Sequence, residues 1–232
     1  MKQICVHGLG QAPSDWEALL RLLDTPGESL CPDLAQLVPP EKTTYPALCR
    51  AFSWLCDGQA APVALCGLSL GAVLALHYAA ERPARVGALV LIAPQYRAPR
   101  RLLRVQNALF RVLPPAAFRG TGFTKDRVLQ LCGSLMDLDL SEALRRVSCP
   151  VLVLCGSRDR ANKRASAELA RLLSGAEFHI VEGAGHALNR EAPEQLAALI
   201  RDFYARALPC GEMRNGAEMP AKDETDRRRG HV

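Results

Sequence analysis

The sequence predicts an α/β fold: a mostly parallel, doubly wound sheet of about six strands that is flanked by helices. Short apolar runs alternate with longer helical runs along most of the 232 residues. Strands that are apolar throughout are typical of a parallel sheet that helices cover on both faces. Hydrophobic residues make up 49% of the chain, which is enough for a sizeable core.

Six segments have the composition of strands, and five longer segments, four between the strands and one after the last strand, have the pattern of helices. The predicted strands are residues 2–7, 29–31, 62–66, 86–93, 149–155 and 177–181. The predicted helices are residues 14–23, 44–56, 70–81, 163–173 and 193–206. This order gives a core made of residues 1–94 and 141–208, interrupted by a helical insertion at 95–140. Residues 209–232 are polar and are predicted to form a disordered tail.

The charge is concentrated in one part of the chain. The net charge is +5, but residues 97–127 alone carry +7, which leaves −2 for the remainder. This distribution indicates one basic segment and not a nucleic-acid-binding protein. No apolar run approaches the roughly 20 residues that span a bilayer, and no signal peptide is evident. The nine cysteines form no C-x-x-C pair, which favours reduced, buried thiols in a cytoplasmic protein over disulfides or a zinc site.

Ser69 is the candidate nucleophile. It is the centre of Gly67-Leu68-Ser69-Leu70-Gly71, directly after one predicted strand and directly before a predicted helix. A serine on such a tight turn has a strained backbone and needs small neighbours, and the turn lifts its hydroxyl above the carboxyl end of the sheet. The pentapeptide alone is a common pattern, so the prediction depends on the strand before it and the helix after it.

A serine hydroxyl needs a base to act as a nucleophile at neutral pH, and the base needs an acid to orient it. His186 is the candidate base because Gly183-Ala184-Gly185-His186 follows the last predicted strand. Asp159 is the candidate acid because Gly156-Ser157-Arg158-Asp159 also follows a strand. A solvated loop acid or a helix cap is the alternative for Asp159, and Asp137 and Asp139 are alternative acids.

An oxyanion hole requires backbone N–H groups that point at the developing negative charge. Leu70, the residue after the nucleophile, is one candidate donor. Leu9 is the other, since His7-Gly8-Leu9-Gly10 follows the first predicted strand and its glycines permit a close backbone approach. We expect His7 to order this loop.

These motifs occur in one order: His-Gly, Gly-x-Ser-x-Gly, Gly-x-x-Asp and Gly-His. In this order the chain resembles the α/β-hydrolase superfamily, in particular its small bacterial serine esterase and lyase-like members, over residues 2–206. The resemblance implies that residues 95–140 form a cap over the active site. It disfavours epoxide and haloalkane hydrolysis, because family members with those activities have Asp at the position of Ser69.

Within the predicted cap, Leu102, Val105, Leu109 and Val112 recur at helical spacing, and several arginines lie outside this stripe. We expect the stripe to face the pocket, which gives an apolar roof. The alternative is a basic amphipathic helix that binds a membrane surface or an acidic partner. The candidate substrate-binding residues are Leu109, Phe110, Phe123 and Met136.

The sequence therefore predicts a serine hydrolase that cleaves a small ester or thioester through an acyl-serine intermediate. An alternative uses the same three residues for lactone or carbon–carbon bond hydrolysis, or for a lyase reaction on an anionic metabolite. A further alternative is a non-catalytic binding protein. We expect a small-molecule substrate, no metal or organic cofactor, no nucleic acid and no stable membrane insertion. The sequence leaves the oligomeric state open.

Overall fold

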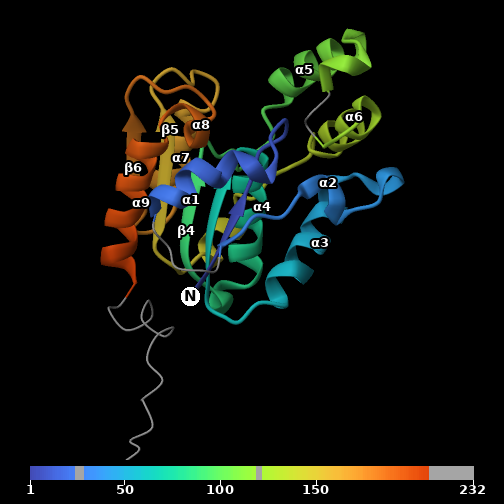
Figure 1. Cartoon of the computed structure of the whole chain (residues 1–232). Coiled ribbons are helices and arrows are strands. Elements are labelled where there is room, and N and C mark those ends of the chain that lie inside the picture. Colours follow the sequence, from blue (N-terminus) through green and yellow to red (C-terminus); the bar gives the residue numbers. More distant parts are fainter. Residues whose placement is uncertain (24–28, 119–121, 209–232) are drawn as a thin grey trace, which may run out of the picture.

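The computed structural model describes residues 1–23, 29–118 and 122–208. Its six strands form one sheet in the order β2-β1-β3-β4-β5-β6, and every neighbouring pair is parallel, which confirms the predicted fold (Figure 1). The strands are β1 (Lys2–Val6), β2 (Ser29–Leu30), β3 (Val63–Leu68), β4 (Val86–Ile92), β5 (Val151–Gly156) and β6 (Glu177–Val181).

Helices cover both faces of the sheet. Successive side chains of each strand point to opposite faces, so strands that are mostly apolar present an apolar surface on each side. On β3, Val63 and Leu65 belong to one apolar cluster, whereas Cys66 and Leu68 belong to the other. The first cluster includes side chains of α3 (Tyr45–Asp57), α4 (Leu70–Glu81) and α7 (Lys163–Leu172), and the second includes those of α1 (Glu17–Leu23) and α9 (Pro193–Ala207).

Short helical segments occupy several of the connections along the chain. They are α2 (Leu34–Leu37), α8 (Leu188–Glu191) and the 3-10 turns Pro13–Trp16, Pro40–Lys42, Pro83–Arg85, Pro115–Phe118 and Ala143–Arg146.

Two further helices, α5 (Arg100–Val112) and α6 (Lys125–Ser134), lie between β4 and β5. They extend beyond the end of the sheet at the upper right of Figure 1. A short antiparallel bridge between Arg97 and Asp139 joins the two ends of this segment. The predicted tail, residues 209–232, lies outside the described residues.

Eight of the nine cysteines lie in the described part of the chain, and all eight are free thiols. Cys210 lies outside it. None of the described helices is both long and apolar enough to cross a membrane.

Candidate active site

Ser69 lies at the junction of β3 and α4. Its backbone has φ 53° and ψ −111°, in the positive-φ region that a residue with a side chain rarely adopts. The Ser69 amide nevertheless donates to the Ile92 carbonyl at 2.9 Å, so the sheet holds the strained residue in place. The side chain therefore stands at the carboxyl end of β3 and at the N-terminus of α4, where the helix dipole favours negative charge.

The glycines of the turn are required by close backbone approaches. A Cβ atom at Gly67 would lie 2.4 Å from the carbonyl oxygen of Gly71. A Cβ atom at Gly71 would lie 2.0 Å from the carbonyl oxygen of Val6 in β1. Real Cβ contacts of this length do not occur, so α4 can pack against β1 only with glycine at position 71.

Asp159 and His186 form a hydrogen-bonded pair. Asp159 follows β5, His186 follows β6, and the distance from Asp159 Oδ2 to His186 Nδ1 is 2.7 Å. The Asp159 side chain is 5% exposed and the His186 side chain 45%. Burial by itself would raise the pKa of Asp159, but hydrogen bonds from His186 and Asn162 outweigh it and hold that pKa below its ordinary value. The carboxylate is thus charged at neutral pH and can orient an imidazole.

Asn162 is a functional candidate that the sequence analysis missed. Its Nδ2 group donates to both carboxylate oxygens of Asp159, at 3.0 and 2.9 Å. Its Oδ1 atom accepts from Gln95 Nε2 at 2.7 Å. Asn162 therefore fixes the orientation of the carboxylate and connects it to the start of the segment that carries α5. The one feature of the sequence that could have indicated Asn162 is its position three residues after Asp159.

Glu191 is a second missed residue, and it holds the backbone on both sides of His186. Its carboxylate accepts from the Gly185 amide at 2.7 Å and from the Ala187 amide at 3.0 Å. These two bonds fix the loop that presents the imidazole. Nothing in the pattern around Glu191 distinguishes it from an ordinary helix residue.

The predicted oxyanion donors, Leu9 and Leu70, border one cavity together with Ser69. Within the described residues, neither amide donates a hydrogen bond to another protein group. His7 is buried and orders the Leu9 loop: its Nδ1 atom contacts the Gly8 carbonyl at 2.9 Å, and its Nε2 atom accepts from the Leu34 amide at 3.2 Å. Burial lowers the pKa of His7, so the ring is neutral.

The same loop is joined to the segment after His186 by a buried amide pair. Gln11 Oε1 accepts from the Gly8 amide at 3.2 Å, and Gln11 Nε2 donates to Asn189 Oδ1 at 2.9 Å. Both side chains are buried. This pair links the candidate oxyanion loop to α8.

Ser69, Asp159 and His186 border the same cavity as the two candidate oxyanion donors. Its volume is about 410 Å³. Its remaining lining is mostly apolar and comes from α4, from the segment between β4 and β5, and from the Asp159 loop: Val73, Gln95, Ala98, Pro99, Leu103, Gln106, Cys132, Leu135, Leu138, Ala161 and Asn162.

The structure corrects the four predicted cap residues, none of which lines this cavity. Leu109 is 52% exposed, because α5 turns Leu103 and Gln106 inward instead of the predicted stripe. The Phe110 ring packs edge-to-face against Phe118, with 5.5 Å between their centroids.

The other two cap residues have different surroundings. The ring of Phe123 is buried under the Arg127 guanidinium, 5.0 Å from its centroid. The backbone carbonyl of Met136 accepts a hydrogen bond from Arg100 Nε at 3.1 Å. Neither side chain is part of the cavity wall.

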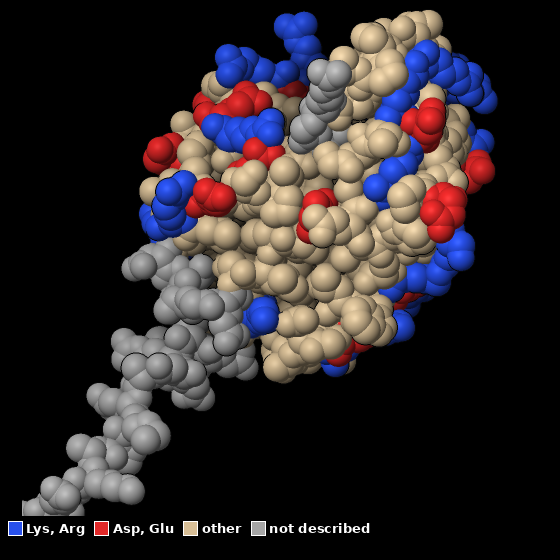
Figure 2. Space-filling view, turned by 45° about the vertical axis from the view of Figure 1, so that its right-hand side comes forward, with Lys and Arg blue, Asp and Glu red and all other residues tan. Residues whose placement is uncertain are grey.

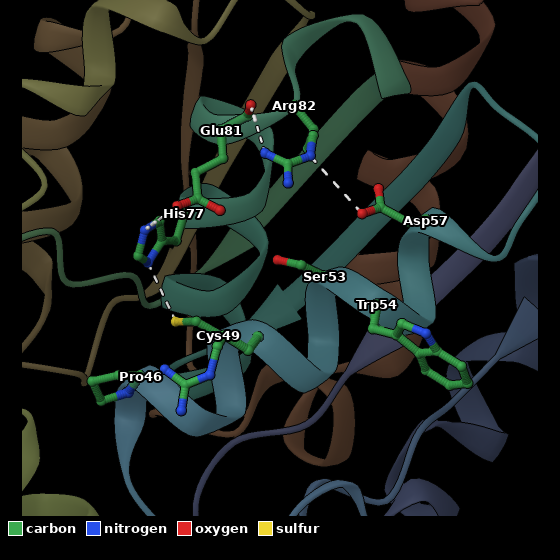
Figure 3. A pocket seen from close by; sticks show the side chains of 9 residues that line it. Pro46, Cys49, Ser53, Trp54, Asp57, His77, Glu81 and Arg82 are labelled. Atoms are coloured by element: carbon green, nitrogen blue, oxygen red, sulfur yellow. Dashed lines mark hydrogen bonds and ion pairs between the residues drawn. The ribbon is translucent and has the colours of Figure 1, made fainter.

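A second cavity of about 430 Å³ lies between α3 and α4, and Figure 3 shows the side chains that line it. His77 Nδ1 lies 3.3 Å from Cys49 Sγ, and His77 Nε2 lies 3.3 Å from Glu81. Burial raises the pKa of the Cys49 thiol to about 12, so this thiol is protonated and a poor nucleophile. No predicted site residue borders this cavity. Among the described residues, no group of three or more His, Cys, Asp or Glu side chains is arranged to hold a metal ion.

Solved structures with the same fold include a thermophilic esterase from Thermogutta terrifontis and the enol-lactonase from Burkholderia xenovorans LB400. The esterase has a TM-score of 0.75 and 22% sequence identity, covering 89% of this chain and 90% of that chain. The lactonase has a TM-score of 0.71 and 23% identity, covering 88% of this chain and 91% of that chain.

Curated relatives match in sequence as well. The biotin biosynthesis bifunctional protein BioHC of Cellvibrio japonicus is 28% identical over 245 residues, covering 87% of this chain and 47% of that protein. The putative carbamate hydrolase RutD of Escherichia coli O81 is 34% identical over 113 residues, covering 48% of this chain and 39% of that protein. The chain spans less than half the length of these relatives. A model of the alpha/beta hydrolase family matches residues 3–199. The chain therefore belongs to the alpha/beta hydrolase family.

Proposed function

We propose that this protein is a serine hydrolase that cleaves a small ester or thioester through an acyl-serine intermediate. The observation that carries the proposal is the Asp159–His186 pair, 2.7 Å apart, in the same cavity as Ser69 on its strained turn. The names of similar proteins, an esterase and a putative carbamate hydrolase among them, support a hydrolytic reaction.

In this mechanism the Nδ1–H group of His186 donates to Asp159, which leaves Nε2 as the base. Nε2 takes the proton of Ser69 as Oγ attacks the carbonyl carbon, and the Leu9 and Leu70 amides stabilise the oxyanion. His186 then gives that proton to the leaving alcohol or thiol. A water molecule attacks the acyl-serine with His186 again as the base, which releases the acid and restores Ser69.

The cavity lining favours an uncharged acyl group. Leu103, Leu135 and Leu138 contribute apolar side chains, and no Lys or Arg is among the described lining residues. A substrate carboxylate would lose its hydration there without gaining a cation, which costs several kcal/mol. The lining thus gives less support to the alternative reactions on an anionic metabolite.

A panel of p-nitrophenyl esters tests this specificity. We expect kcat/KM to be highest between butanoate and octanoate, since each buried CH₂ contributes ~0.8 kcal/mol until the cavity is full. The monosuccinate ester, whose acyl chain ends in a carboxylate, should be at least ~10-fold poorer than the butanoate because its charge is desolvated. Absence of turnover at every chain length would contradict the proposal.

A fluorophosphonate probe tests the nucleophile directly. We expect covalent labelling of the wild-type protein and none of Ser69→Ala, because the probe reacts only with an activated serine. Ser53→Ala is the matched control, since Ser53 borders the second cavity (Figure 3) and has no role in the mechanism. Equal labelling of wild type and Ser69→Ala would show that Ser69 is not the nucleophile, and no labelling of either protein would favour a non-catalytic protein.

A further inference from the structure

The outward face of α5 carries an apolar strip. Val105, Leu109 and Val112 are 69%, 52% and 78% exposed, and their spacing of four and three residues puts them on one side of the helix. The opposite side of α5, which includes Leu103 and Gln106, lines the active-site cavity. The inward packing of α5 therefore leaves three aliphatic side chains in contact with solvent.

Most of the basic side chains around α5 are already engaged. Arg97 pairs with Glu168 at 3.1 Å, and Arg100 pairs with Asp137 at 3.0 Å. Lys125 donates to the backbone carbonyls of Arg111 and Leu113. Arg127 donates to those of Ala35 and Val38.

Arg101, Arg104 and Arg111 are different. All three are exposed, and none forms an ion pair within the described residues. Residues 100–112 contain no acidic side chain. On a helix with 100° per residue, Arg104 and Arg111 lie 20° apart and beside the strip of Val105 and Val112. Along the upper edge of the molecule, where α5 lies, blue basic side chains adjoin uncharged surface (Figure 2).

We propose that the outward face of α5 binds the surface of an anionic phospholipid bilayer, as a peripheral contact without insertion of a spanning segment. The aliphatic strip would enter the headgroup boundary, and Arg101, Arg104 and Arg111 would contact lipid phosphates. The strip has no aromatic side chain of the kind that anchors a protein–protein interface, which favours a lipid surface over an acidic protein. The cavity lies behind α5, so this docking leaves its lining intact.

Co-sedimentation with lipid vesicles tests the proposal on the full chain. The vesicles are phosphatidylcholine alone, or phosphatidylcholine with one quarter phosphatidylglycerol. We expect binding to the mixed vesicles at low salt and at least tenfold weaker binding to the neutral ones. Raising the salt to about 0.5 M should also weaken binding to the mixed vesicles, because exposed charges are screened.

Two variants separate the two parts of the surface. The double variant Arg104→Glu, Arg111→Glu should weaken binding to mixed vesicles at least tenfold. The double variant Val105→Gln, Val112→Gln should also weaken binding to mixed vesicles at least tenfold, and at every salt concentration. The matched charge control is Arg50→Glu with Arg171→Glu, exposed arginines outside α5 that also form no ion pair within the described residues and should change binding less than twofold. Circular dichroism and the Tm of each variant establish that it is folded.

Three results would overturn the proposal: equal binding to neutral and anionic vesicles, no binding to either, or an equal loss in the control variant. If neither vesicle binds while polyglutamate retains the protein in a salt-dependent way, the same face binds an acidic protein instead.

Discussion

His186→Ala is expected to lower kcat for a p-nitrophenyl ester by about 10⁶-fold, because without the imidazole nothing removes the Ser69 proton. Asp159 cannot replace the lost base, because its carboxylate contacts His186 Nδ1 at 2.7 Å and its other hydrogen bonds come from Asn162. The carboxylate therefore acts only through the imidazole. Steady-state kinetics on the purified variant measure the effect.

A double variant distinguishes a shared unit from independent contributions. Asp159→Asn alone should lower kcat by about 10⁴-fold, since the amide favours the wrong tautomer of His186. When Asp159→Asn is combined with His186→Ala, it should lower kcat almost no further. His179→Ala is the matched control, because His179 is a half-exposed residue of β6 near Glu177 and should keep full activity. If His186→Ala retained activity within tenfold of wild type, His186 would not be the base.

Gly71→Ala is expected to lower the free energy of unfolding by roughly 4 kcal/mol or more, the range of the most damaging single substitutions. The new Cβ would meet the Val6 carbonyl oxygen at 2.0 Å and the His7 carbonyl oxygen at 2.8 Å. Both partners are backbone atoms, one in β1 and one just after it, so no side-chain rotation relieves the overlap. Urea unfolding followed by circular dichroism measures the loss.

Gly133→Ala provides the control for this substitution. Gly133 lies in α6, and a Cβ there would meet nothing within 4 Å. Alanine should therefore stabilise the protein by up to about 1 kcal/mol, since it lowers the conformational entropy of the unfolded chain. Equal stability of Gly71→Ala and wild type would mean that α4 does not pack against β1 as described.

The sheet and the candidate triad were accessible from sequence because each depends on local patterns. Ser69, Asp159 and His186 each follow a predicted strand within a few residues, and parallel strands bring their carboxyl ends to one edge. The predicted helix 70–81 begins and ends where α4 does. Nothing about long-range packing was needed for these inferences.

The orientation of α5 was not accessible in the same way. Its sequence contains two apolar faces, one through Val105 and Leu109 and the other through Leu103 and Phe110. Periodicity shows that a helix is amphipathic but not which face meets the protein. The buried pair of Gln11 and Asn189 was inaccessible for a similar reason, since 178 residues separate its members.

The shared direction of the six strands also decides how this protein should be attached to a solid support. Every candidate catalytic group follows the carboxyl end of a strand, so the turns that enter the strands face the other way. Strands of five to seven residues separate these two edges by about 17–23 Å. The turn before β6, where Gly175 is open to solvent, is such a place. A linker attached there would leave the cavity mouth unobstructed.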